Sequence, residues 1–256
     1  MMGRVDAHIH MGYYPRLGSE DLAYYSPRRI VGILDRCDVD EFVVSSTSSQ
    51  IDEISFRDII REAEEMKLRA GSRAHIFFWL SGRLYDEDRS MGWLSSGVFE
   101  GVKFHERETP WLGCRKSELK NILKRLSDLN LPVQFHTGDD DGCRPLDLME
   151  LAKEFSSVRF DFSHCRQMPA SARVVAECSN VFVDTAYLAA SRMGELKEYD
   201  WKGRLMYGSD LPVWQAHEGV SLTKAYRANI LAFNRAAGGP CKKAFNRFLH
   251  GKDYDE

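Results

Sequence analysis

The sequence predicts an α/β fold, a single (β/α)8 TIM barrel, from two observations. First, eight short apolar runs recur along the chain, and most are continuous in hydrophobicity, as in parallel strands buried on both faces. Second, stretches with helical spacing lie between these runs, as in successive βαβ units. A chain of 256 residues suits one barrel, and no linker or composition break divides it. We therefore expect residues 1–256 to form one domain.

The elements follow from these patterns. The expected strands are residues 4–10, 41–47, 75–81, 101–105, 132–137, 159–165, 181–186 and 205–210. The expected helices are residues 52–69, 117–129, 146–155, 170–178 and 221–237. In the clearest helix, Ile54, Ile59 and Ala63 share one side and charged residues occupy the other. A doubly wound open sheet is the alternative fold, but its Gly-rich phosphate turn is missing after the first strand.

Composition and charge exclude several classes of partner. The formal net charge is −3 and the Lys and Arg residues are scattered, so no basic surface for nucleic acid or an anionic membrane is expected. No apolar run approaches a membrane span, and the first residues leave no room for a signal peptide. Six dispersed cysteines without C-x-x-C spacing are typical of reduced thiols. We expect a cytoplasmic protein whose partner is a small molecule.

The first expected strand ends in two histidines. His8 and His10 are separated by one residue, so their imidazoles point to the same face of a strand and lie close together. Two neutral imidazoles fixed side by side form half of a divalent-metal site. Taken alone, the pair is better explained by two polar residues in a turn.

Polar residues at the ends of other strands favour the metal site over the turn. His136 ends the fifth strand, His164 the sixth and Asp210 the eighth. Lys103 and His105 end the fourth. In a barrel these ends emerge on one face, where the active sites of the fold lie. Five of the eight histidines therefore fall at strand ends, which random placement does not favour.

These strand-end motifs resemble those of the amidohydrolase superfamily, particularly the single-zinc branch related to aminocarboxymuconate-semialdehyde decarboxylase. The matching motifs are Asp6-Ala7-His8-Ile9-His10, Gly101-Val102-Lys103-Phe104-His105, Phe135-His136, Phe162-Ser163-His164, Val183-Asp184-Thr185 and Tyr207-Gly208-Ser209-Asp210-Leu211-Pro212. They occur in the family's order from the first strand to the last, so the resemblance spans nearly the whole chain. Each motif is short, but together they are specific.

The resemblance implies a divalent metal, most simply one Zn²⁺ per chain. The implied ligands are His8, His10, His136 and Asp210. Three nitrogens and one carboxylate suit Zn²⁺ and leave a position for water, whose pKa falls from about 15.7 to about 7 on binding. Asp210 would take a proton and pass it to the leaving group, while His164 would hydrogen-bond the water or polarise the substrate carbonyl. If the two residues have only a structural role, Asp210 is a helix cap or turn residue and His164 is a core histidine whose hydrogen bonds are made within the protein.

The fourth strand leaves the number of metals open. In two-metal members of the superfamily a lysine here is carboxylated and bridges the metals. TatD-like deoxyribonucleases use a glutamate instead, for which Glu106 is the candidate. Lys103 and His105 share a face, whereas Glu106 points away unless the strand has ended. We expect Lys103 to be an unmodified, internally paired cation and His105 to shape the pocket, with a second metal as the alternative.

Residues just after the strand ends are candidates for substrate binding. Loops on this face set specificity in the fold. Arginine binds carboxylate or phosphate through a bidentate fork, so several arginines here favour an anionic substrate, although any single one is more simply a solvated charge. The candidates are Arg16, Arg107, Arg144, Arg166 and Trp214.

Together these features predict a metal-dependent hydrolase that directs metal-bound hydroxide at a small, anionic amide, ester or lactone. One alternative is non-oxidative decarboxylation of an unsaturated or aromatic acid at the same metal. It is weakened because the interval after the first strand is shorter than in many decarboxylases of the family. Further alternatives are a TatD-like phosphodiesterase and a non-catalytic barrel that binds a ligand or a metal. The resemblance also suggests a homodimer, which no residue pattern requires.

Overall fold

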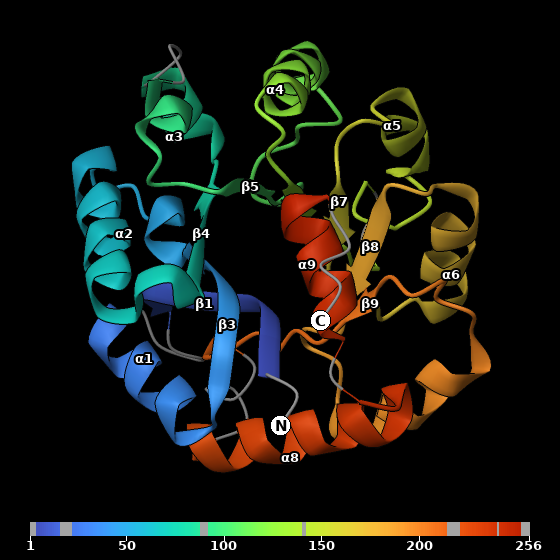
Figure 1. The fold of residues 1–256 in the computed structure, drawn as a ribbon. Coiled ribbons are helices and arrows are strands. Elements are labelled where there is room, and N and C mark those ends of the chain that lie inside the picture. The colour runs from blue at the N-terminus through green and yellow to red at the C-terminus, as the bar shows by residue number, and fades with distance from the viewer. Residues whose placement is uncertain are drawn as a thin grey trace.

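The barrel predicted from the sequence is confirmed by the computed structural model, which describes residues 4–15, 22–87, 92–139, 142–213, 221–239 and 241–251. The strands are β1 Arg4–Pro15, β2 Leu22–Tyr25, β3 Val39–Ser46, β4 Ala74–Trp79, β5 Gly101–Phe104, β6 Val133–Phe135, β7 Phe160–Phe162, β8 Val181–Asp184 and β9 Leu205–Met206. They form one sheet in the order β2-β1-β3-β4-β5-β6-β7-β8-β9 (Figure 1). Strands β1 and β3 to β9 are parallel neighbours and match the eight predicted runs.

Backbone hydrogen bonds between the two ends of the parallel series close the barrel. The Ala7 amide donates to the Tyr207 carbonyl at 2.7 Å, and the His10 amide donates to the Leu211 carbonyl at 2.6 Å. The segment after β9 therefore pairs with β1. This closure brings the first predicted histidine pair beside the predicted Asp210, although about two hundred residues separate them in the sequence.

Helices surround the strands (Figure 1). They are α1 Pro27–Arg36, α2 Phe56–Ala70, α3 Gly82–Glu87, α4 Lys116–Asp128, α5 Met149–Glu154, α6 Met168–Glu177, α8 Leu222–Ala237 and α9 Lys242–His250, with 3₁₀ segments η1 Thr47–Gln50, η2 Gly71–Arg73, η3 Gly92–Ser96 and η4 Ala190–Glu198. The five predicted helices correspond to α2, α4, α5, α6 and α8. Helix α2 begins four residues later than predicted because Ser55 and Asp58 form a capping box that fixes its start.

Helix α9 was not predicted, and it closes the N-terminal end of the barrel. Phe245 and Phe248 belong to the same buried cluster as Phe77 and Phe182 of the strands. The ring of Phe248 lies 5.9 Å from that of Phe77 and 5.7 Å from that of Phe182. Figure 1 shows α9 in the middle of the ring of strands. The interior of the barrel is thus filled by side chains at this end.

The first strand extends past the predicted end and forms a hairpin arm with β2. Gly12 pairs with Tyr25 in antiparallel register, and the pairing continues to Pro15 with Leu22. Gly12 has a φ of 93°, and a Cβ there would lie 2.4 Å from the Ser48 hydroxyl oxygen, so only glycine fits. The arm carries the chain beyond the C-terminal mouth of the barrel.

Two predictions concern the chain as a whole. All six cysteines are free, as expected for reduced thiols. Among the described residues, no helix has both the length and the apolar character that crossing a membrane requires.

Candidate metal centre

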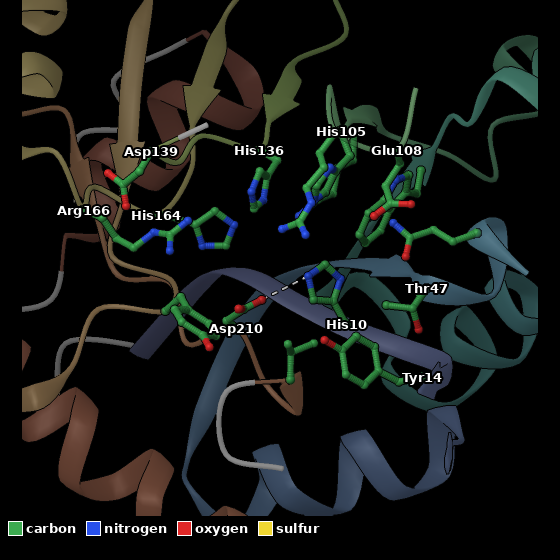
Figure 2. Close-up of a pocket in the computed structure, with 16 residues that line it drawn as sticks. His10, Tyr14, Thr47, His105, Glu108, His136, Asp139, His164, Arg166 and Asp210 are labelled. Atoms are coloured by element: carbon green, nitrogen blue, oxygen red, sulfur yellow. Dashed lines mark ion pairs between the residues drawn. The ribbon is translucent and has the colours of Figure 1, made fainter. Parts of the chain in front are cut away.

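A cavity of about 460 Å³ lies at the C-terminal ends of the strands (Figure 2). It is lined by most of the residues that the sequence singled out. They are His10, Lys103, His105, Arg107, His136, His164, Arg166 and Asp210. The barrel places them together because parallel strands end on the same face.

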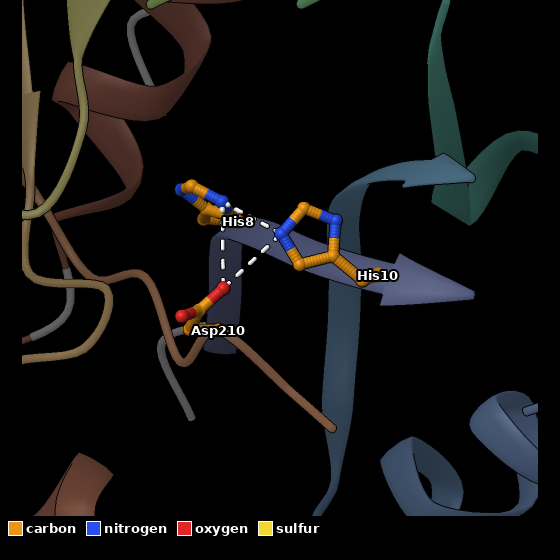
Figure 3. A group of neighbouring side chains, drawn as sticks. All are labelled: His8, His10 and Asp210. Atoms are coloured by element: carbon orange, nitrogen blue, oxygen red, sulfur yellow. Dashed lines mark hydrogen bonds and ion pairs between the residues drawn. The ribbon is translucent and has the colours of Figure 1, made fainter. Parts of the chain in front are cut away.

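Three side chains converge beside this cavity: His10 and Asp210 line it, and His8 is buried behind them. The Nε2 atoms of His8 and His10 lie 3.1 Å apart. Asp210 Oδ1 lies 3.6 Å from the Nε2 of His8 and 3.1 Å from that of His10. All three residues are buried, and their ligand atoms lie within 4.8 Å of one another (Figure 3). The three side chains, which we call the donor set, thus direct two imidazole nitrogens and one carboxylate oxygen at a single point.

The hydrogen bonds behind the two imidazoles favour a cation at this point. His8 Nδ1 lies 2.8 Å from Asp184 Oδ2 and must donate to this carboxylate, so the Nε2 atom of His8 carries a lone pair. His10 Nδ1 lies 3.0 Å from the Ser45 hydroxyl, which accepts from it in the matching tautomer. Two lone pairs and a carboxylate oxygen then face one another. The Lys103 ammonium lies 2.5 Å from one of these lone pairs, on His8 Nε2, and a divalent metal bound by all three groups would take the place of this contact. Two imidazole nitrogens and a carboxylate are ligands that Zn²⁺ takes, so these residues fit a metal site.

Burial tunes the protonation of these groups. Burial and the nearby charge of Lys103 lower the pKa of His8 to about 4. Burial also lowers the pKa of His10 well below its ordinary value. Burial raises the pKa of Asp210 to about 6, against the attraction of His8 and Lys103. At neutral pH both imidazoles are therefore neutral and Asp210 is ionised, the states in which each binds a metal.

Asp184 orients the site from the end of β8, and no role was predicted for it. Its Oδ2 accepts from His8, and its Oδ1 accepts the backbone amides of His164 at 3.0 Å and Ala186 at 2.7 Å. Burial alone would raise the pKa of Asp184, but the neighbouring His8 holds this pKa well below its usual range. One carboxylate thus fixes two predicted site residues. The sequence signals were its position at a strand end and its place in the Val183-Asp184-Thr185 motif.

His164 lies beside His8, with 4.9 Å between their ring centroids. Its Nδ1 lies 3.1 Å from the Ala186 carbonyl and donates to it, so the Nε2 atom keeps a lone pair. His164 and Asp210 both have positive φ, at 73° and 56°. Such conformations are costly for residues other than glycine and concentrate at functional sites. The two predicted catalytic residues share this feature.

Lys103 is a buried cation directly above the donor set. Its Nζ lies 2.5 Å from the Nε2 of His8 and 4.8 Å from the centre of the Trp79 ring. Burial lowers the pKa of Lys103 to about 8, against the attraction of Asp210. Lys103 is thus still charged at neutral pH. The lysine contacts His8, and the charges of Asp210 and Asp184 attract it.

His136 lines the cavity but lies outside the convergent group of three. Its ring stacks on that of His105 at 3.8 Å, and the ring of His164 lies 4.5 Å away. His105 in turn stacks on Trp79 at 5.6 Å with an interplanar angle of 8°. The row of rings forms one wall of the cavity. The predicted four-residue ligand set is therefore three residues at one point and a fourth on the wall nearby.

Comparison with known proteins identifies the family. The family model described as Amidohydrolase matches residues 5–230. This chain belongs to the amidohydrolase family. The resemblance inferred from the strand-end motifs is thereby confirmed. A search of curated proteins found no match for this amidohydrolase.

Solved structures of low sequence identity share its fold. A protein from Pseudomonas putida described as a candidate 2-pyrone-4,6-dicarboxylic acid hydrolase is 16% identical, with a TM-score of 0.65 and full coverage of both chains. IDCase from Metarhizium anisopliae is 13% identical, with a TM-score of 0.62 over 98% of this chain and 95% of that one. A further candidate 2-pyrone-4,6-dicarboxylic acid hydrolase, from Acinetobacter baumannii with citric acid bound, is 14% identical, with a TM-score of 0.60 over 98% and 97% of the chains.

Glu106 does not face the donor set of this amidohydrolase. Both of its carboxylate oxygens accept the Leu112 amide, at 2.9 and 3.0 Å. Because β5 ends at Phe104, the chain has turned before Glu106, and this carboxylate organises the loop after the strand. The structure therefore places Glu106 away from the position that a second metal would need. Lys103 and His105 remain in the cavity.

The predicted substrate-binding residues separate into three groups. Arg107 and Arg166 line the cavity. Arg144 does not, because its guanidinium forms an ion pair with Asp147 at 3.0 Å on the surface. Arg16 and Trp214 lie outside the described residues.

Arg166 is the better placed of the two cavity arginines. Its Nε is buried and has no hydrogen-bond partner among the described residues. Its guanidinium lies over the Tyr187 ring at 5.5 Å. A Cβ at Gly138 would come within 2.8 Å of its Nη2, so glycine there leaves space for the guanidinium. Figure 2 shows Arg166 extending into the cavity near His164.

Proposed function

We propose that this amidohydrolase is a hydrolase that uses one divalent metal, most simply Zn²⁺, to cleave an amide, ester or lactone bond in a small anionic substrate. The observation that carries the proposal is the convergence of His8, His10 and Asp210, the last two of which line the cavity. Two imidazole lone pairs and one carboxylate form a donor set that suits Zn²⁺. His136, on the cavity wall, is the proposed fourth ligand.

The protein's own residues supply the remaining chemistry. A bound divalent metal polarises a carbonyl and activates water. Asp210 accepts a proton from the attacking water and returns it to the leaving group. The Nε2 of His164 is held as an acceptor by the bond from Nδ1 to Ala186 and accepts a hydrogen bond from the incoming water. Lys103 supplies positive charge where negative charge develops on the substrate oxygen.

An anionic substrate is supported by Arg166. A buried guanidinium nitrogen without a partner is unfavourable unless a ligand completes its hydrogen bonds. A carboxylate bound in a bidentate fork would do so. Two of the similar solved structures are described as candidate hydrolases of 2-pyrone-4,6-dicarboxylic acid, so a cyclic ester with carboxylates is the first substrate to test.

The decisive experiment measures turnover of 2-pyrone-4,6-dicarboxylate and a panel of lactone, ester and amide carboxylates in ¹⁸O-labelled water. The proposal predicts metal-dependent turnover of at least one member, with one ¹⁸O atom in the product. We expect Asp210→Asn to lower kcat by about a thousandfold, because a positioned acid–base group contributes on this order. Carbon dioxide release without ¹⁸O incorporation would establish the decarboxylase alternative. No turnover across the panel by metal-loaded protein would favour a non-catalytic barrel.

A further inference from the structure

The first strand, β1, contains a β-bulge next to the proposed metal ligands. Asp6 is level with Phe42 of the neighbouring strand β3, and Ile9 is level with Val44. Three steps along β1 therefore match two steps along β3, so β1 holds one extra residue between Asp6 and Ile9. Because side chains alternate along a strand, one extra residue moves every later side chain to the opposite face of the sheet.

The packing of β1 shows this change of face. Before the bulge, Val5 and Ala7 belong to the buried cluster inside the barrel. After it, Ile9 and Met11 belong to the other buried cluster, which includes residues of α1 and α2. A regular strand would keep these four apolar residues on one face and turn the two histidines away from the barrel interior. The bulge therefore directs both histidines toward Asp210, as Figure 3 shows.

Side chains hold the peptide group between Ala7 and His8 from both of its polar ends. The His8 amide donates to Asp6 Oδ1 at 3.0 Å. The Ala7 carbonyl accepts a hydrogen bond at 3.0 Å from Nε2 of Gln134, which belongs to β6. Strand β6 is not a neighbour of β1 in the sheet, so this hydrogen bond crosses the interior of the barrel.

Gln134 is itself fixed by a second hydrogen bond. Its Nε2 also donates to Asp161 Oδ2 at 2.8 Å. Asp161 is level with Gln134 on the next strand, β7, and both side chains are buried. Both hydrogens of the amide nitrogen are thus used, and the Ala7 carbonyl can only accept, so the orientation of the amide is determined. This arrangement offers the Ala7 carbonyl a donor in a fixed position.

We propose that Gln134 is a positioning residue for the metal centre: its amide holds the Ala7–His8 peptide in the bulge and thereby fixes the direction of the two histidines. The inference deepens the proposed function and rests on the metal site proposed there. Gln134 is not among the described residues that line the cavity. It therefore acts through the backbone of β1 and not on the substrate.

Gln134→Met tests this role, because it keeps the length of the side chain and removes the amide. We expect zinc binding, measured by competition with a chromogenic chelator, to weaken by about tenfold, the lower range for residues that orient metal ligands. We also expect a changed visible absorption spectrum of the Co²⁺-loaded protein, which reports ligand geometry. Gln134→Asn is the second variant. It stays polar but is one methylene shorter, so it should lose the bond to Ala7 and weaken zinc binding in the same way.

Asn180→Leu is the matched control. The Asn180 amide nitrogen also donates to backbone carbonyls, those of Ala152, Phe155 and Val158 around the end of α5. Its loss removes comparable hydrogen bonds away from β1, so zinc binding should stay within about threefold of wild type, with an unchanged Co²⁺ spectrum. Circular dichroism checks that each variant is folded.

Hydrogen exchange of residues 5–11 tests the bulge without any metal. In the metal-free protein we expect faster amide exchange of this segment in Gln134→Met than in wild type or in Asn180→Leu, because the bulge has lost one of its hydrogen bonds. Mass spectrometry of peptides from this segment measures the difference.

The outcomes separate this inference from the proposed function. Zinc binding by Gln134→Met at wild-type strength, or a loss no larger than that of Asn180→Leu, would overturn the role of Gln134 and leave the metal site in place. Failure of the wild type to bind zinc or cobalt would instead contradict the proposed function. Hydrogen exchange then decides alone: faster exchange in Gln134→Met supports control of the bulge, and unchanged exchange overturns it.

Discussion

We propose that the chemistry of this amidohydrolase depends on His8, His10 and Asp210, which converge at one point. We expect His8→Ala and Asp210→Ala to weaken zinc binding by at least about a hundredfold, since each removes a direct ligand from a small donor set. Competition with a chromogenic zinc chelator measures this. His105→Ala is the matched control because His105 lines the same cavity outside the convergent group, and zinc binding there should stay within about threefold of wild type.

His136→Ala belongs to the same series and decides the number of protein ligands. Loss of zinc comparable to His8→Ala would support His136 as the fourth ligand. Retention of zinc with loss of activity would limit the ligands to three and assign His136 to the substrate wall.

The pKa values of two buried groups, Asp210 and Lys103, determine how metal affinity should change with pH. Burial raises the pKa of Asp210 to about 6, so protons compete with the metal for this carboxylate below that pH. We expect zinc affinity to fall about tenfold per unit as the pH drops from 6 to 4.5. Lys103, with a pKa lowered to about 8, loses its charge above that pH, so affinity should rise between pH 7 and 9. Lys103→Met should remove the alkaline rise and retain the acidic fall, whereas an unchanged profile would contradict this role.

Arg166 and Arg144 provide a matched pair for testing substrate charge. Arg166 lines the cavity, whereas Arg144 pairs with Asp147 on the surface. We expect Arg166→Met to raise KM for a carboxylate substrate by about tenfold or more, because a charge-assisted hydrogen bond is lost. KM for the corresponding methyl ester should change little, and Arg144→Met should change neither. An equal effect of Arg166→Met on acid and ester would refute carboxylate recognition.

At the scale of elements, the contact between β1 and the segment after β9 holds the proposed metal ligands in place. Asp6 Oδ1 accepts the amides of His8 and Ser209, both at 3.0 Å, and its Oδ2 accepts the Tyr226 hydroxyl at 2.9 Å. One buried carboxylate therefore fixes the backbone beside His8 and beside Asp210. It also joins both segments to α8, which carries Tyr226.

Asp6→Ala should lower the free energy of unfolding by about 3 kcal/mol, since it leaves buried donors without an acceptor. Urea denaturation measures this change. Tyr226→Phe removes only one of the donors and should cost about 1 kcal/mol. Asp200→Ala, at an exposed position, is the control and should have an effect within about 0.5 kcal/mol of zero. Equal stability of Asp6→Ala and wild type would show that this carboxylate does not hold the closure.

The parallel strands could be predicted because a strand buried on both faces is a continuous apolar run, and all eight runs matched. Elements outside that alternation could not. Strand β2 is four residues long and pairs only with the extended end of β1, and α9 follows α8 without a strand between them. Both are stabilised by tertiary contacts, such as Phe248 against Phe77, which local spacing does not reveal.

The site was predictable in its strand-end residues and not in their supports. Asp184 and His8 are 176 positions apart, and only the closed barrel brings the two together. The pairing of Arg144 with Asp147 and the turn that takes Glu106 away from the cavity are loop geometries, which the sequence pattern does not determine.

At the scale of the whole molecule, the two ends of the barrel differ. The C-terminal end carries the proposed metal centre, with the loops after the strands around it. The N-terminal end is filled by α9, whose Phe245 and Phe248 pack among the strands.

Metal content per chain tests the proposed hydrolase most directly. Plasma mass spectrometry should be applied to protein purified without chelators or nickel affinity resin. We predict about one zinc ion per chain in wild type and a near-complete loss in Asp210→Ala. Two metals per chain would require a second site at Lys103 or His105. No bound metal in wild type, even after reconstitution with zinc, would contradict the central claim.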